Sequence, residues 1–259
     1  MGNINEVTSR GRSRYDGFWI TLNKRFAGGL QFNGSYTLSN SKDTNSLSSQ
    51  PVVVQDSNNI EGDFAPSDFD VRNRFVLSGL WELPFKGNQL VEGWQIAVIT
   101  QGQSGNPVNV VTNLGFTGVI NTVRPDLIGN IDVIGTPDQW FSNTVCDPRI
   151  PGSCTADSVF ALPVSPDGVF HFGNLARNTV RGPSFFNTDL SLIKRTRVGP
   201  TTVEFRAEAF NVFNHPNLGQ PARIATVGST SFGVVSNTRL PTGDAGSARQ
   251  LQFALKLLF

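Results

Sequence analysis

Residues Arg249–Phe259 read RQLQFALKLLF and alternate between apolar and mostly polar side chains. Successive side chains of a β-strand point to opposite faces, so this pattern predicts a strand with one apolar and one mostly polar face. A transmembrane β-barrel crosses the hydrocarbon layer with strands of about ten residues, apolar outward and polar inward. The apolar members are Leu251, Phe253, Leu255, Leu257 and Phe259. A barrel requires further strands of this kind.

Six further stretches show the same period of two. They are 15–24, 30–39, 74–84, 94–103, 186–195 and 202–213. The connections between the predicted strands alternate short and long, and the long ones are loops 40–73, 104–185 and 214–247. Outer-membrane barrels place short turns at the periplasmic rim and long loops outside. We therefore predict an all-β, antiparallel up-and-down transmembrane barrel with long extracellular loops.

Seven strands is an odd number, whereas single-chain bacterial barrels generally have an even one. The opening residues Met1–Arg14 have the character of a loop that follows a missing strand. We therefore expect residues 1–259 to be a partial barrel, the C-terminal portion of a larger one.

Composition excludes several function classes. The 21 basic and 20 acidic residues give a net charge of +1, which offers no electrostatic argument for nucleic-acid binding. The first residues contain no apolar core of a signal peptide, and no uninterrupted apolar stretch is long enough for a transmembrane helix. A membrane role must therefore use strands.

Two cysteines, Cys146 and Cys154, lie in the Pro- and Gly-containing segment VCDPRIPGSC. Metal binding needs more ligands than this segment offers. A local disulfide in a loop exposed to an oxidising compartment is the favoured interpretation.

Catalytic and metal-binding patterns are weak. Ser191 and Lys194 match the S-x-x-K pattern, but on a strand their side chains point to opposite faces. The histidines, His171 and His215, lie in different loops, where structural roles are favoured over ligand contact. The acidic stretch 56–70 lacks the spacing of an EF-hand, so solvated loop charge is favoured over calcium binding. We expect no enzyme activity, no metal and no cofactor.

Polar side chains on the second face of the strands would line the lumen of a barrel. They include Gln95, Gln101, Asp189, Glu204, Arg206 and Glu208. For the three charged residues from 204 to 208, a hydrogen-bonded lumen wall is favoured over direct ligand contact. Trp81, Phe85 and Trp94 gather at the predicted periplasmic rim, as interfacial aromatics do. The alternative for these aromatics is core packing in a soluble β-sandwich.

Several segments together resemble the C-terminal barrel of TonB-dependent outer-membrane receptors, particularly the Oar-like group. They include LNKRFAGGLQFNGSYTLSNS, VRNRFVLSGLWELPF, GWQIAVITQGQSGNPVNV, RNTVRGPSFFNTDLSLIKR, EFRAEAFNVFNHPN and RQLQFALKLLF. The resemblance implies a barrel in the Gram-negative cell outer membrane, filled by an N-terminal plug, that takes up ligand with energy from the TonB complex. The sequence contains no plug, so we expect the plug and the missing strands to belong to the same receptor.

The resemblance also implies a role for the final strand. In outer-membrane proteins the barrel-assembly machinery recognises a last strand that ends in Phe with apolar residues at every second position, which here are Leu251, Phe253, Leu255, Leu257 and Phe259. The expected partners are therefore outer-membrane lipid, the assembly machinery and, indirectly, the TonB complex. The alternative function is a soluble secreted β-sandwich that binds carbohydrate or mediates adhesion.

Overall fold

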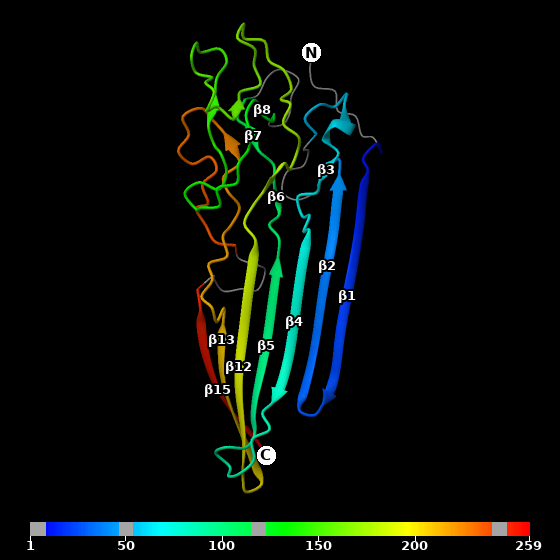
Figure 1. Ribbon diagram of the computed structural model, residues 1–259, viewed down its shortest axis with the longest axis vertical. Helices are drawn as coiled ribbons and strands as arrows, with labels where there is room; N and C mark the ends of the chain where they lie inside the picture. The colour runs from blue at the N-terminus through cyan, green and yellow to red at the C-terminus, as the bar shows by residue number, and fades with distance from the viewer. Residues whose placement is uncertain (1–8, 47–53, 115–122, 240–247) are drawn as a thin grey trace.

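Seven long strands form one continuous antiparallel sheet (Figure 1). The computed structural model describes residues 9–46, 54–114, 123–239 and 248–259. In sheet order, the strands are β1 (Ser13–Ala27), β2 (Leu30–Asp43), β4 (Asn73–Glu82), β5 (Trp94–Gln103), β12 (Phe185–Val198), β13 (Thr201–Phe210) and β15 (Gln250–Leu258). Each pairs with the strand that follows it in the sheet, which confirms the predicted antiparallel up-and-down fold.

The connections lie as the alternation of their lengths predicts. The β1–β2, β4–β5 and β12–β13 connections and the C-terminus are at the lower end of the sheet in Figure 1, whereas the long loops are at the upper end. Gly28 and Gly29 close the β1–β2 turn with φ angles of 62° and 76°, a conformation that glycine adopts without steric cost.

Several strand boundaries differ from the predicted ones. β13 ends at Phe210 and not at residue 213, because Asn211 and Asn214 adopt left-handed φ angles of 48° and 51°. β2 continues to Asp43, into the predicted loop 40–73. Of the predicted loop segment Met1–Arg14, residues 1–8 lie outside the described residues, and Ser13 already belongs to β1.

The sheet is open. Within the described residues, β1 and β15 are its edges, and no second sheet packs on its apolar face. On this face of β15, the side chains of Leu251, Phe253, Leu255 and Leu257 are instead 51% to 68% exposed. The β-sandwich alternative is not supported, because a sandwich buries this face against another sheet.

The long loops carry short elements of their own. These are η1 (Ile60–Asp63), β3 (Ala65–Pro66), β6 (Pro107–Val108), β7 (Val111–Thr112), β8 (Asp126–Leu127), β9 (Val145–Cys146), β10 (Phe160–Ala161), β11 (Val180–Arg181) and β14 (Ile224–Ala225). β11 pairs with β6 and β14 pairs with β7, which joins segments far apart in the sequence. No helix in the described part of the chain is long and apolar enough to cross a membrane.

These loops enclose the main hydrophobic core, and we call the structure they form the loop assembly. Its centre is three fully buried rings, Phe141, Phe160 and Phe232, which meet edge to face with centroids 5.3 to 6.4 Å apart. Edge-to-face contact stabilises aromatic pairs beyond the area that they bury. Aliphatic residues from several loop segments complete the core, including Val108, Val110, Val159, Leu175 and Val180.

Candidate functional site

The apolar face of the sheet is the first functional surface. On β15 the outward side chains include Phe253 and Leu255, and Phe253 stacks on Phe205 of β13 with centroids 6.3 Å apart. A contiguous apolar surface of this kind marks contact with a membrane or a partner. Phe259 follows β15 and is 98% exposed. Its role, with Leu251, Phe253, Leu255 and Leu257, as a barrel-assembly signal stays a prediction.

Aromatic side chains lie at the short-turn end of this surface. Trp81 and Phe85 are 46% and 52% exposed, and the Trp94 indole Nε1 donates a hydrogen bond to the Leu90 carbonyl at 3.0 Å. The Lys194 ammonium is 5.6 Å from the centre of the Trp94 ring. An amphipathic ring with a lysine beside it suits the boundary between hydrocarbon and water, and the interfacial role stays a prediction.

The opposite face of the sheet is polar. Strand register places the six predicted polar residues on this one face: Gln95, Gln101, Asp189, Glu204, Arg206 and Glu208. Side chains on it bind one another across strands. Gln95 donates to Glu82 at 2.6 Å, and Ser191 donates to Glu208 at 3.2 Å.

Glu204 is the most buried charge of the polar face, at 3% exposed. Its two carboxylate oxygens accept hydrogen bonds from Arg195 at 2.7 Å and Arg206 at 2.8 Å. Each of these arginines remains about half exposed, at 47% and 42%. Burying an unpaired carboxylate costs free energy, so Glu204 needs both arginines as partners. We therefore assign Arg195 and Arg206 a structural role on the polar face.

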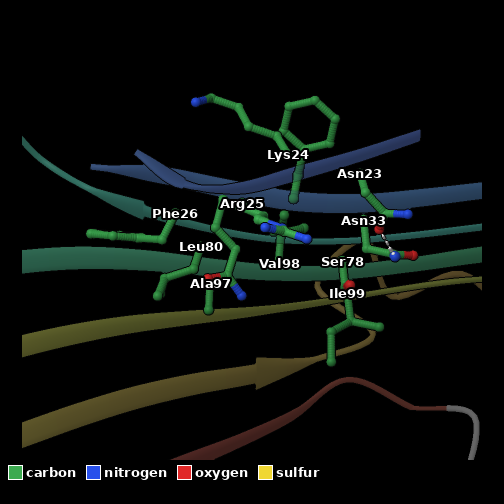
Figure 2. A pocket seen from close by; sticks show the side chains of 13 residues that line it. Asn23, Lys24, Arg25, Phe26, Asn33, Ser78, Leu80, Ala97, Val98 and Ile99 are labelled. Atoms are coloured by element: carbon green, nitrogen blue, oxygen red, sulfur yellow. Dashed lines mark hydrogen bonds between the residues drawn. The ribbon is translucent and has the colours of Figure 1, made fainter. Parts of the chain in front are cut away.

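A hollow of about 690 Å³ lies on the same face over β1, β2, β4 and β5 (Figure 2). One row of side chains crosses the hollow, because each member is paired with the next one on the neighbouring strand. The row is Asn23, Asn33, Ser78 and Ile99. Asn33 donates to Asn23 within this row. The floor is thus amide and hydroxyl groups with apolar side chains between them, which suits a water-filled or protein-filled lumen.

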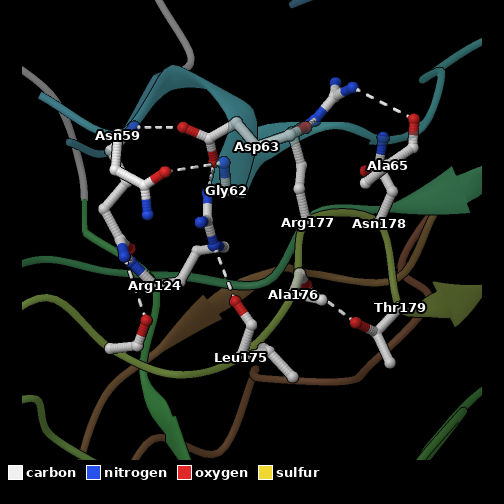
Figure 3. Close-up of polar contacts among 12 residues, drawn as sticks. Asn59, Gly62, Asp63, Ala65, Arg124, Leu175, Ala176, Arg177, Asn178 and Thr179 are labelled. Carbon is white, nitrogen blue, oxygen red and sulfur yellow. Dashed lines mark hydrogen bonds and ion pairs between the residues drawn. The ribbon is translucent and has the colours of Figure 1, made fainter. Parts of the chain in front are cut away.

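Buried ion pairs join the loop assembly to the end of β2 and to loop 40–73. Figure 3 shows two of the arginines that form them, Arg124 and Arg177. Arg177 is fully buried and pairs with Asp43, at the end of β2, and with Asp68 at 3.3 Å. Arg124 pairs with Asp63 and donates through Nε to the Leu175 carbonyl at 2.7 Å.

A third pair completes this set, between Arg181 and the fully buried carboxylate of Asp70. All three arginines come from loop 104–185, and their partners come from β2 and loop 40–73. We call the three arginines and four aspartates the arginine clasp. The prediction that stretch 56–70 is solvated loop charge holds for Glu61, which is exposed, but is wrong for two of the clasp aspartates: Asp63 and Asp70 are each 1% exposed. They are buried because arginines distant in the sequence neutralise them.

Gln55 binds both loops beside the clasp. Its backbone N–H donates to Asp63 at 2.8 Å, its side-chain amide donates to the Gly173 carbonyl at 2.9 Å, and its Oε1 accepts from the Arg124 N–H at 2.7 Å. Three hydrogen-bonding groups, on Asp63, Gly173 and Arg124, are thereby satisfied by one buried residue. The sequence prediction missed this residue and all three arginines, because no local spacing distinguishes them from other loop residues.

The disulfide segment runs from the buried Cys146 in β9 to the exposed Cys154. Cys146 and Cys154 are bonded, with Cα atoms 5.0 Å apart. Next to Cys146, the Asp147 carboxylate accepts from the Arg149 guanidinium at 2.8 and 3.0 Å. The hydrogen bond from Arg149 lowers the pKa of Asp147, while burial of the carboxylate acts in the opposite direction. The segment 146–154 is therefore held by a covalent and an ionic link.

The remaining candidate chemical groups are separate. Ser191 lies opposite Ala97 and Lys194 opposite Trp94, on alternate faces of β12. His171 contacts Asp126 at 2.7 Å, whereas the His215 ring lies against Phe186 with centroids 6.2 Å apart. Within the ranges that the structure describes, no group of three or more His, Cys, Asp or Glu side chains could hold a metal ion.

Residues 1–252 match the family model described as the outer membrane beta barrel domain. The chain belongs to this family. Membership places the protein in the outer membrane and its apolar face against lipid. In barrels of this membrane the short turns face the periplasm, so the loop assembly is on the extracellular side. No curated protein matches the chain.

Proposed function

We propose that this barrel sheet, with its loop assembly, is the wall and extracellular part of a TonB-dependent receptor that takes up ligand across the outer membrane. The observation that best supports this receptor function is that the long loops form an assembly with its own buried core. Extracellular loops that only connect strands need no core, whereas these bury three phenylalanine rings and several charged side chains. A rigid scaffold outside the membrane suits capture of a ligand.

The open sheet supports a larger receptor. β1 and β15 run in the same direction, because they are the first and last of seven antiparallel strands. Direct pairing of these edges would be parallel, and outer-membrane barrels are antiparallel throughout. Closure therefore needs an odd number of further strands, and unpaired edges in lipid cost several kcal/mol for each unsatisfied group. In this proposal, the same receptor supplies those strands and a plug.

The test is TonB-dependent uptake. Depletion of small molecules from the growth medium is compared for wild-type cells, cells lacking the gene and cells lacking TonB. The proposal predicts that the same compounds remain in the medium of both deletion strains. A compound that requires this gene but not TonB would contradict it, and so would identical depletion with and without the gene.

A further inference from the structure

The loop assembly contains a hollow of its own, of about 380 Å³, which we call the hydroxyl hollow. Its walls come from three segments: 143–145, which leads into β9, 153–158, on the other side of the disulfide, and 226–229, which follows β14. Six of the ten residues that line it are serine or threonine, and Val145 is the one with a hydrocarbon side chain. The volume falls within the range of small-molecule sites, about 300–1,000 Å³.

The walls of the hydroxyl hollow are fixed to the hydrophobic core of the loop assembly. The Asn143 amide donates to the carbonyl of Phe232, a fully buried core residue, at 2.8 Å. The Thr144 hydroxyl donates to the Asp157 carbonyl at 2.7 Å, which joins the first wall segment to the second, and the disulfide links the same two segments covalently. A site that is ordered before binding loses less entropy when a ligand enters.

Two serine hydroxyls of the hollow are held by backbone N–H groups. Ser153 Oγ accepts from the Asp147 N–H at 3.0 Å, and Ser158 Oγ accepts from the Thr155 N–H at 3.1 Å. A hydroxyl that accepts in this way keeps its own proton to donate. Within the described residues, neither proton has an acceptor. Both hydroxyls are therefore positioned and free to donate to a ligand.

One charged side chain lines the hydroxyl hollow, the exposed Asp157. In the part of the chain that the structure describes, its carboxylate has no hydrogen-bond donor and no cation as a partner. The lining residues include no Lys, Arg or His, so an anion would meet only negative charge there. A single carboxylate is also too few ligands for a metal ion. The chemistry that remains is hydroxyl donors beside a strong acceptor.

We propose that the hydroxyl hollow binds a small, neutral ligand with several hydroxyl groups, of the chemistry of a sugar. Hydroxyls of such a ligand can donate to the carboxylate of Asp157 and accept from Ser153 and Ser158, because a hydroxyl group does both. The inference rests on the proposed function in taking the loop assembly as the part that captures the ligand, and it adds the class of that ligand.

The experiment is saturation-transfer NMR on the full chain in a polyoxyethylene detergent, which carries no sugar group. The probes are glucose, galactose, mannose, maltose and cellobiose, with glucuronate as an anionic counterpart of glucose. The test variants are D157N, which removes the charge, and T226V, which removes one lining hydroxyl at nearly constant shape. The matched control is D167N, an exposed aspartate of the same long loop that does not line the hollow. Slower gel migration after heating verifies that each variant is folded.

We expect transfer from the protein to at least one neutral sugar, and weaker transfer to glucuronate. D157N should bind that sugar about tenfold more weakly than wild type, because hydrogen bonds to a charged acceptor are lost, and T226V about threefold more weakly. D167N should bind as wild type does. Absence of transfer to every neutral sugar would overturn the inference, as would equal affinity of wild type and D157N or tighter binding of glucuronate. TonB-independent uptake would contradict the proposed function and leave this binding result unchanged.

Discussion

The sheet and the loop assembly use apolar side chains in opposite ways. On β15 the apolar residues point away from the protein, and Phe253 and Leu255 are 67% and 68% exposed. In the loop assembly, Phe141 and Phe160 are fully buried. Lipid solvates the first region and water the second, so the same residue types face outward in one and inward in the other. Each region should therefore respond to its own class of substitution.

The largest expected effect is on the loop assembly, from Arg177→Met. The variant leaves Asp43 buried without its partner, which costs about 3–5 kcal/mol for a buried ion pair. Hydrogen exchange should increase around Phe141 and Phe160, and the strands should keep their protection. The matched double variant R177M/D43N removes both charges and should recover part of the loss. An equal loss of protection in the sheet would show that the two regions are not independent.

Second in size is a charge on the lipid face. Leu255→Lys should destabilise the protein by about 2–4 kcal/mol if the residue lies near the middle of the bilayer, because the ammonium is placed in hydrocarbon. Gln252→Lys is the control, on the polar face of the same strand. The measurement is the folded fraction in outer membranes, by gel migration with and without heating. Equal losses in both variants would contradict the assignment of the two faces.

The difference between the regions also explains what could be predicted from the sequence. A strand between lipid and a polar lumen must alternate at every second residue, so all seven long strands were recognisable. β15 is an example, with a large apolar side chain at every second position from Leu251 to Leu257. Only strand ends were wrong, as at Asn211, where a left-handed residue stops β13. The division of each strand into an apolar and a polar face needed no contact information.

The loop assembly could not be predicted in the same way. Its core is made of single phenylalanines that recur at no regular spacing, since irregular loops impose no period on buried positions. The clasp joins Arg177 to Asp43 across 134 residues, and only the folded chain brings them together. Asp63 and Asp70 of the acidic stretch 56–70 were therefore misjudged as solvated, because the composition of the stretch is that of an ordinary polar loop.

Removing the disulfide should affect the loop assembly less than Arg177→Met does. Replacing Cys146 and Cys154 by Ser releases a short closed segment and should cost about 2–3 kcal/mol by the loop-closure relation. Proteolysis should become faster within 146–154, while folding of the sheet in the membrane is unchanged. A variant that assembles poorly would show that the segment contributes to folding of the barrel as well.

The smallest expected effect is the response of the same segment to acid. Arg149 lowers the pKa of Asp147 in the folded protein. The ionic link therefore contributes stability above the ordinary carboxyl pKa of about 4 and loses it as the pH falls through the lowered folded value. Protease protection of segment 146–154 should decrease slightly between about pH 4 and about pH 2 in wild type, and less in Asp147→Asn. Because the Arg149 side chain is 40% exposed, the effect should be weaker in high salt. If protease protection falls equally with pH in wild type and in Asp147→Asn, other carboxylates cause the decrease. The aspartates of the arginine clasp would then be tested next.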